Sequence, residues 1–263
     1  MMASDLTNKF PVFFQKGWFL VVFVLLQLIP PYASHGYAWQ DLPLVNAYIL
    51  THPIKIFSAN LFPIFQLIPL LLLVAVFFLG NRVSRIFSLY VALTYFLVAF
   101  LQNISISEKY GLAICVGNVL TFLLLSGFWF WEFILPKNEF LVQKRPLWKY
   151  WPILLALVAF WGPINPGTLL PDFNPMYILT TGSGLSFCMA TPLYLAILIT
   201  FSGRINHRVW MATSFIGIMM SLGNMVLEFV VYPSYWWIGV LHFPLLILSM
   251  VGFILSVRHL IGK

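Results

Sequence analysis

Apolar segments long enough to cross a lipid bilayer follow one another along nearly the whole chain, and they constrain the fold more than any other feature. The segments lie at 18–32, 59–80, 84–103, 110–134, 148–164, 175–202, 208–232 and 235–257. A helix of about 20 apolar residues spans the hydrocarbon core of a bilayer. The sequence therefore predicts an all-α integral membrane protein with about eight transmembrane helices.

Composition excludes a soluble protein and a nucleic-acid partner. Of the 263 residues, 61% are hydrophobic and 8% are charged, whereas a soluble domain carries about 25% charged residues. The net charge of +7 comes from cations in short loops between spans, where they orient the chain. The first segment resembles a signal peptide but lacks a small-residue cleavage site after Pro31, so we interpret it as a span. We expect contact with the lipid bilayer and none with nucleic acid.

The basic residues predict the orientation of the chain. With eight spans and a cytoplasmic amino terminus, only Lys55 and Lys109 of the 14 lysines and arginines lie outside. This asymmetry is what the positive-inside rule requires. Both termini are therefore predicted to be cytoplasmic. The outer side then carries a loop at 33–58, a turn at 104–109 and a second loop at 166–175.

Spacings repeat between the two halves of the sequence. Pro69, Gly80 and Arg85 match Pro192, Gly203 and Arg208 at a constant offset of 123 residues. The segment starting at Tyr110 likewise matches the segment starting at Tyr235, at an offset of 125. The pattern predicts two tandem four-helix halves, residues 1–140 and 146–263, in parallel orientation. Chance matching between apolar sequences is the alternative.

Two ionisable residues lie deep within the last two apolar segments. Glu228 precedes the turn around Pro233, and His242 follows it by a similar number of residues. In a helical hairpin, the rise of about 1.5 Å per residue puts both at similar depth. We therefore expect them to meet. An ionisable residue at membrane depth is costly and indicates a functional site, so we interpret the pair as a candidate for binding a ligand or handling a proton.

Uncharged polar residues gather near the predicted outer ends of the helices. Polar groups in hydrocarbon must face the bundle interior and find partners. This distribution predicts a polar cavity that opens outward, although bonding between helices explains any single member equally well. The candidate lining residues, besides the ionisable pair, are Asn224, Asn118, Gln66, Asn103, Thr181 and Ser183.

Glycines and aromatic residues each leave two interpretations open. The segment from Thr180 to Gly184, followed by Pro192, indicates either tight helix packing or a broken helix at a binding site. Aromatic residues make up 18% of the chain. Their clusters at 128–131, 148–151 and 235–237 are typical of interfacial belts, and they would also suit an aromatic-lined pocket.

Three classes of function remain after the motif search. There is no phosphate-binding glycine loop, zinc-protease motif or hydrolase serine elbow, so we expect no cofactor and no metal. The favoured function is a secondary transporter or carrier of a small solute, with an outward-facing polar cavity. A membrane-embedded enzyme acting on a lipid or isoprenoid substrate is one alternative. The other is a non-catalytic subunit or assembly factor of a larger membrane complex or oligomer.

Overall fold

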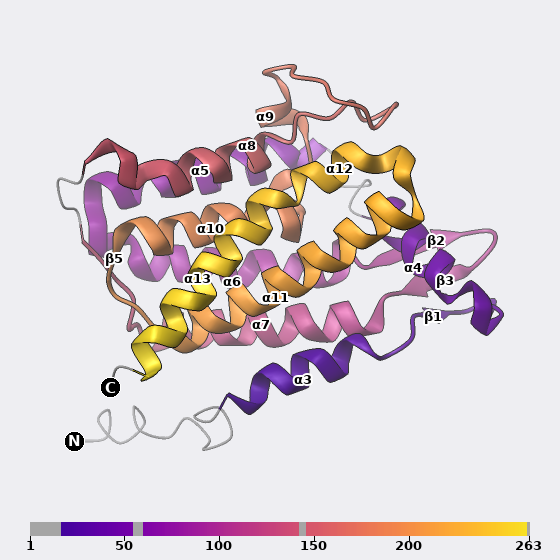
Figure 1. Cartoon of the computed structure of the whole chain (residues 1–263), viewed down its shortest axis with the longest axis horizontal. Helices are drawn as coiled ribbons and strands as arrows, with labels where there is room; N and C mark the ends of the chain where they lie inside the picture. The colour runs from indigo at the N-terminus through magenta and orange to yellow at the C-terminus, as the bar shows by residue number, and fades with distance from the viewer. Residues whose placement is uncertain (1–16, 55–59, 142–145, 262–263) are drawn as a thin grey trace.

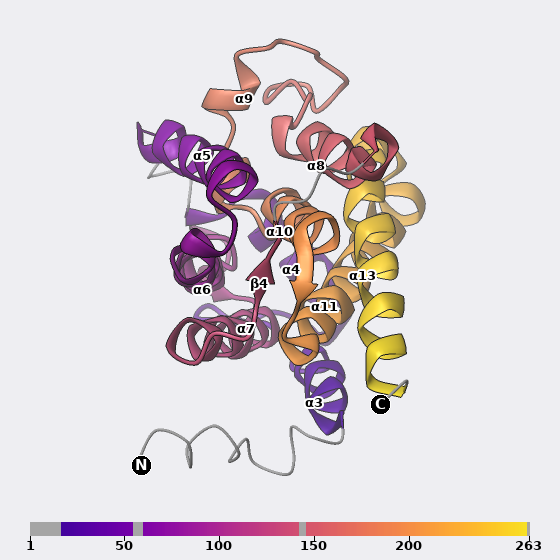
Figure 2. The same ribbon diagram turned by 90° about the vertical axis from the view of Figure 1, so that its left-hand side faces the viewer.

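The computed structural model describes residues 17–54, 60–141 and 146–261, and within these ranges the chain is mostly helical (Figure 1). The long helices run along the long axis of the molecule. The view along this axis shows them gathered around α10 (Phe187–Phe201), nearly all of whose residues are buried (Figure 2). Helices satisfy every backbone polar group internally, which apolar surroundings require.

The helices differ widely in length. Their bounds are α3 Trp18–Gln27, α4 Leu42–Thr51, α5 Phe62–Leu79, α6 Ser84–Leu101, α7 Val116–Ile134, α8 Trp151–Trp161, α9 Tyr177–Thr180, α10 Phe187–Phe201, α11 His207–Val226, α12 Trp236–Leu241 and α13 Phe243–Ile261. Between α5 and α6 the chain turns through η3 (Gly80–Val83), where Gly80 adopts φ 53° and ψ −125°. Glycine suits this turn because a positive φ is costly for other residues.

Within the described residues, three helical runs are long and apolar enough to cross a membrane. They are Phe62–Leu101, Val116–Ile134 and His207–Val231. Two bent pairs, Tyr177–Leu185 with Phe187–Phe201 and Pro233–Leu241 with Phe243–Arg258, raise the number to five if each pair is one span. These apolar helices indicate an integral membrane protein, with fewer clear spans than the eight that the sequence predicts.

One face of α5 shows why the molecule suits a lipid environment. Leu71, Val74 and Phe78 are spaced three and four residues apart, so they lie on one side of the helix. They are 63%, 51% and 72% exposed. A stripe of exposed large apolar side chains is unfavourable in water and compatible with lipid. The apolar helices therefore indicate contact with the bilayer.

The end of the molecule predicted to face outward contains a β-sheet, so the expectation of an all-α protein is wrong there. Strands β2 (Ile104–Ser107) and β3 (Gly111–Ile114) form an antiparallel hairpin, and β1 (Tyr32–Ala33) pairs with β3. Side chains alternate between the two faces of β2, and here Ser105 is buried whereas Ile106 is exposed. Helix α7 accordingly begins at Val116 rather than Tyr110. The predicted loop at 33–58 also contains helix α4.

At the opposite end of the molecule, a two-stranded sheet and a buried carboxylate hold neighbouring segments of the chain together. Strand β4 (Glu139–Phe140) pairs with β5 (Ser202–Arg204). Beside it, Glu132 of α7 is fully buried. Its Oε1 accepts hydrogen bonds from the backbone of Lys137 and Asn138 at 2.7 and 2.6 Å, and its Oε2 accepts one from Asn206 at 2.6 Å. Glu132 is therefore a second carboxylate within a predicted span, besides Glu228, and the sequence analysis did not single it out.

The aromatic clusters are present but do not all lie at an interface. Trp129 is fully buried, and its indole N–H donates to the Thr213 hydroxyl at 3.0 Å. Its ring also packs edge-on against Phe87. Trp148 and Trp236, by contrast, are 69% and 44% exposed. The clusters at 148–151 and 235–237 thus remain compatible with an interfacial belt, whereas Trp129 belongs to the core.

The helix that contains the Gly-rich segment is broken. Helix α9 and the short turn η5 (Ser183–Leu185) meet α10 at 92°. Packing is also tight at this break, because a Cβ atom at Gly184 would clash with the carbonyl oxygen of Phe65 in α5. The helix is therefore both tightly packed and broken at this segment.

Candidate functional site

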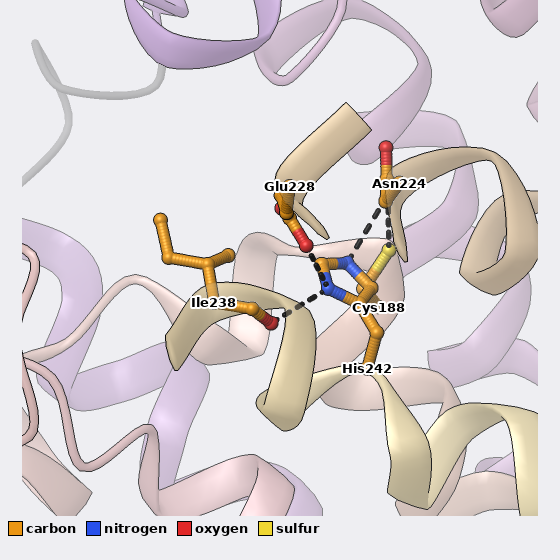
Figure 3. Close-up of polar contacts among 5 residues, drawn as sticks. All are labelled: Cys188, Asn224, Glu228, Ile238 and His242. Atoms are coloured by element: carbon orange, nitrogen blue, oxygen red, sulfur yellow. Dashed lines mark hydrogen bonds and ion pairs between the residues drawn. The ribbon is translucent and has the colours of Figure 1, made fainter. Parts of the chain in front are cut away.

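Glu228 and His242 meet in the structure. Oε2 of Glu228 lies 3.0 Å from Nδ1 of His242 (Figure 3). The Glu228 side chain is 14% exposed and that of His242 is 5% exposed. The two residues come from segments on either side of the turn around Pro233, so the equal depth inferred from the sequence does bring them together.

Both residues lie at irregularities of their helices. Glu228 belongs to η6 (Leu227–Val231), a π-helical turn that continues α11. His242 stands at the junction between α12 and α13, where the helix axis bends by 44°. Single π-helical turns and broken membrane helices occur frequently at functional sites. A break also frees backbone carbonyl groups, and the carbonyl oxygen of Ile238 lies 2.9 Å from Nδ1 of His242.

The contacts of His242 define a tautomer. Nδ1 lies close to two acceptors, the Ile238 carbonyl oxygen and the Glu228 carboxylate, so it carries the proton. Nε2 lies 3.1 Å from Nδ2 of Asn224, an amide donor, so Nε2 accepts. This arrangement describes a neutral imidazole with both nitrogens satisfied. An imidazolium would need Asn224 to turn its amide over and present Oδ1 instead.

Cys188 completes the cluster from α10. Nδ2 of Asn224 lies 3.4 Å from the Cys188 sulfur as well as 3.1 Å from Nε2 of His242. The thiol also lies beside the imidazole (Figure 3). The cluster therefore connects α10, α11, η6 and the α12–α13 junction, although the sequence alone indicated only a packing role for Cys188.

A cavity of about 330 Å³ opens beside Glu228. Helix α4 and the β2–β3 turn line it on one side, and α11, η6, η7 (Pro233–Tyr235) and α12 line the other. Four tyrosines contribute to its wall, namely Tyr48, Tyr110, Tyr232 and Tyr235. Its charged lining residues are Glu228 and Lys109. This combination of apolar wall and a few polar groups is typical of small-molecule sites.

A second cavity of about 190 Å³ adjoins the first. Leu50, Asn224 and Leu227 line both. Asn118 lines the second cavity, together with Gln27 and other residues at the ends of α3, α7 and α11. Asn118, Asn224 and Glu228 therefore line two adjoining cavities, at the end of the molecule that carries the three-stranded sheet.

Three of the predicted residues form a separate cluster. Gln66 of α5 donates to the Thr181 hydroxyl at 2.7 Å, and that hydroxyl lies 2.9 Å from the Ser183 hydroxyl. These residues line neither of the two cavities described above. They join α5 to the broken α9–α10 segment, where Gly184 makes its close contact. Their position fits helix-to-helix bonding rather than a shared cavity.

Asn103 also stands apart. It is fully buried at the end of α6, and its Nδ2 donates to the Val98 carbonyl oxygen at 2.9 Å. Its own backbone carbonyl oxygen accepts from the backbone N–H of Cys115 at 2.9 Å. Asn103 thus closes the connection between α6 and the β2–β3 hairpin.

Lys109, Tyr48 and Tyr110 escaped the sequence-based search. Lys109 is exposed, and its ammonium lies 4.9 Å from the centre of the Tyr110 ring. A hydrogen bond to the Tyr110 side chain raises the pKa of Lys109, so the side chain stays charged. The signal available in the sequence was a lysine at the end of the predicted outer turn, directly followed by a tyrosine.

Neither family models nor curated proteins nor solved structures show any match to this chain. Within the described residues, no group of three or more His, Cys, Asp or Glu side chains could hold a metal ion. The inference of function therefore rests on the geometry of the Glu228–His242 cluster and its cavity.

Proposed function

We propose that this chain is a membrane carrier of a small solute. The cavity beside Glu228 is its solute site, and the Glu228–His242 pair couples solute binding to the gain or loss of a proton. One observation carries this proposal. Two ionisable residues, each on an irregular helix segment, contact each other, and the carboxylate of the pair lines a cavity large enough for a small molecule.

The energetics support a functional rather than a purely structural pair. Placing a carboxylate at membrane depth costs several kcal/mol unless it is neutralised or paired. Oε2 of Glu228 is buried and receives no well-directed hydrogen bond, because the Nδ1 proton points to Ile238. A proton on the carboxylate, or a cationic group of a solute beside it in the cavity, would offset this cost. Binding of either one would therefore change the affinity for the other, which is the requirement for coupling.

The distribution of charge supports the orientation inferred from the sequence. Described basic residues gather at the end with β4, β5 and the last turns of α13 (Figure 1); they are Arg82, Arg85, Lys137, Lys149, Arg204, Arg208 and Arg258. Lys109 lies at the other end. Other cations that entered the prediction, Lys9, Lys16, Lys55, Lys144, Arg145 and Lys263, lie outside the described residues. We propose eight spans with both termini cytoplasmic, in which α3 and α8 are the short spans.

We also propose that the two halves descend from one four-helix unit. Helix α6 packs on α7 in the first half, and α11 packs on α13 in the second. Pro69 and Pro192 lie inside α5 and α10, the helices that precede these pairs. The turns that follow differ, however, because Gly80 lies in η3 and Gly203 lies in β5. The two matching glycines therefore do not shape identical turns.

Proteoliposomes loaded with a pH-sensitive dye test the carrier function. Solutes of four charge types are added outside, with leucine, choline, gluconate and glucose as the probes. We expect one of them to drive proton movement through the wild-type protein and not through Glu228→Gln. The amide keeps the shape of the carboxylate but cannot ionise. The absence of solute-driven proton movement in the wild type, for all four probes, would refute the carrier.

The order of groups around His242 favours a second candidate, a membrane-embedded acyl-transfer enzyme. A thiol, an imidazole and a carboxylate stand in the order of nucleophile, base and orienting group. Cys188 is 5% exposed and lines neither cavity, so the carrier remains the better reading. Cys188→Ala separates the two. A carrier keeps its solute-driven proton movement in this variant, whereas an enzyme loses all turnover of a lipid ester.

A further inference from the structure

The cavity beside Glu228 carries one negative and one positive side chain from different elements. Glu228 lies on η6 and is mostly shielded, whereas Lys109 lies on the β2–β3 turn and is exposed. Both line the same cavity. Glu228 therefore lies at the deep end of the cavity, and Lys109 lies at its outer rim.

The wall between these charges is apolar and aromatic. Besides the four tyrosines, its lining includes Leu44, Ala47, Leu50, Leu227 and Ile238. Tyrosine faces attract cations through their ring electrons, and the Lys109 ammonium already occupies such a position over Tyr110. Among the described residues, no carboxylate lies within ion-pair distance of Lys109; Asp41 attracts it from farther away and does not line the cavity. The lysine is thus available to a ligand.

We propose, on the basis of the carrier function above, that the cavity binds a small zwitterion with an apolar side chain, of the apolar amino-acid type. The ammonium group meets the Glu228 carboxylate at the deep end. The carboxylate meets Lys109 at the rim, and the side chain packs against the leucines and tyrosines. A ligand with a single charge would pair with only one of these two side chains. The other protein charge would then have no partner in the ligand, which costs affinity.

Matched ligands test this assignment on the full chain in detergent or nanodiscs. Thermal-shift titrations compare leucine with leucine methyl ester, which lacks the carboxylate, and with N-acetylleucine, which lacks the ammonium. We expect leucine to bind at least tenfold more tightly than either analogue. Equal binding of the ester and leucine to the wild type would overturn the assignment.

Lys109→Met identifies the partner of the carboxylate. This exposed residue is replaceable without loss of core packing. We expect the variant to bind leucine about tenfold more weakly and the methyl ester unchanged, because only leucine uses the lysine. Lys149→Met is the matched control, since Lys149 also lies over an aromatic ring, that of Trp148 at 5.5 Å, but lines neither cavity. An equal loss for both ligands, or a loss with the control, would overturn the assignment.

The outcome for the ligand class is separable from the outcome for the carrier. If choline, gluconate or glucose drives proton movement that Glu228→Gln abolishes, while leucine neither binds nor moves protons, the carrier stands and the zwitterion is wrong. If leucine binds with the predicted charge dependence but no probe moves protons, the ligand class stands and transport is wrong.

Discussion

Removal of the Glu132 carboxylate tests the stability of the end predicted to be cytoplasmic. In Glu132→Ala, the backbone N–H groups of Lys137 and Asn138 and the amide of Asn206 lose their acceptor. Each buried donor left without a partner costs about 1–3 kcal/mol. Some of these groups can reach water at the surface, so we expect a loss of about 3 kcal/mol in the free energy of unfolding.

Glu132→Gln refines this prediction. One amide oxygen still accepts from the two backbone N–H groups, but the amide nitrogen then faces Nδ2 of Asn206, and two donors meet. The Asn206 side-chain amide cannot easily turn over, because its Oδ1 accepts from the backbone N–H of Arg208 at 3.3 Å. We therefore expect Glu132→Gln to cost about 1–2 kcal/mol, less than the alanine variant.

Thermal unfolding in detergent measures both effects. For a chain of this size, 1 kcal/mol corresponds to about 2–4 °C in Tm, so Glu132→Ala should lower Tm by about 6–12 °C. Glu108→Ala is the control, because Glu108 is exposed and should change stability by no more than about 0.5 kcal/mol. If the two alanine variants unfold at the same temperature, the network does not hold this end together.

Two further predictions follow from packing and orientation. Gly184→Ala should lower the free energy of unfolding by about 1–3 kcal/mol, because the added Cβ meets the Phe65 carbonyl oxygen. Gly127→Ala is the control: its Cβ has open space around it, so this variant should raise the free energy of unfolding by about 0.5–1 kcal/mol. Equal Tm values for the two variants would contradict the close contact at Gly184. Single cysteines at the exposed positions Ser34, Thr168 and Ser234 should react with an impermeant reagent added outside intact cells, and one at exposed Lys137 should not; reversed labelling would refute the orientation. Asn138 is unsuitable for this test because it is buried.

The sequence was sufficient to predict the ionisable pair because its position depends on local geometry. Equal distances along two helices from one turn set the depth of Glu228 and His242, and the π-helical turn and the bend did not separate them. Partners from distant parts of the chain were beyond such reasoning. Lys109 reaches the cavity only because β3 pairs with β2 and β1. Tyr48 does so because a segment that resembled a loop forms α4.

The polar residues that were predicted to line one outward-opening cavity divide into separate groups for a physical reason. Depth along a helix is readable from the sequence, but the direction in which a side chain faces depends on which helices are neighbours. Gln66 faces α9 and η5, and its amide finds Thr181 there. Asn103 turns back on its own helix and bonds to Val98. Residues at one level therefore point to different partners.

The pH dependence of solute-driven proton movement tests the central claim most directly. Initial rates are measured between about pH 5 and pH 9 for the wild type, Glu228→Gln and the exposed control Glu108→Gln. Besides Glu228, the titratable groups at the site are His242, Cys188, Lys109 and the four cavity tyrosines, and all of these remain in each variant. We expect the wild type and the control to share one pH profile, and Glu228→Gln to fold normally but show no pH-dependent rate. An unchanged profile in Glu228→Gln would contradict the assignment of proton coupling to this pair.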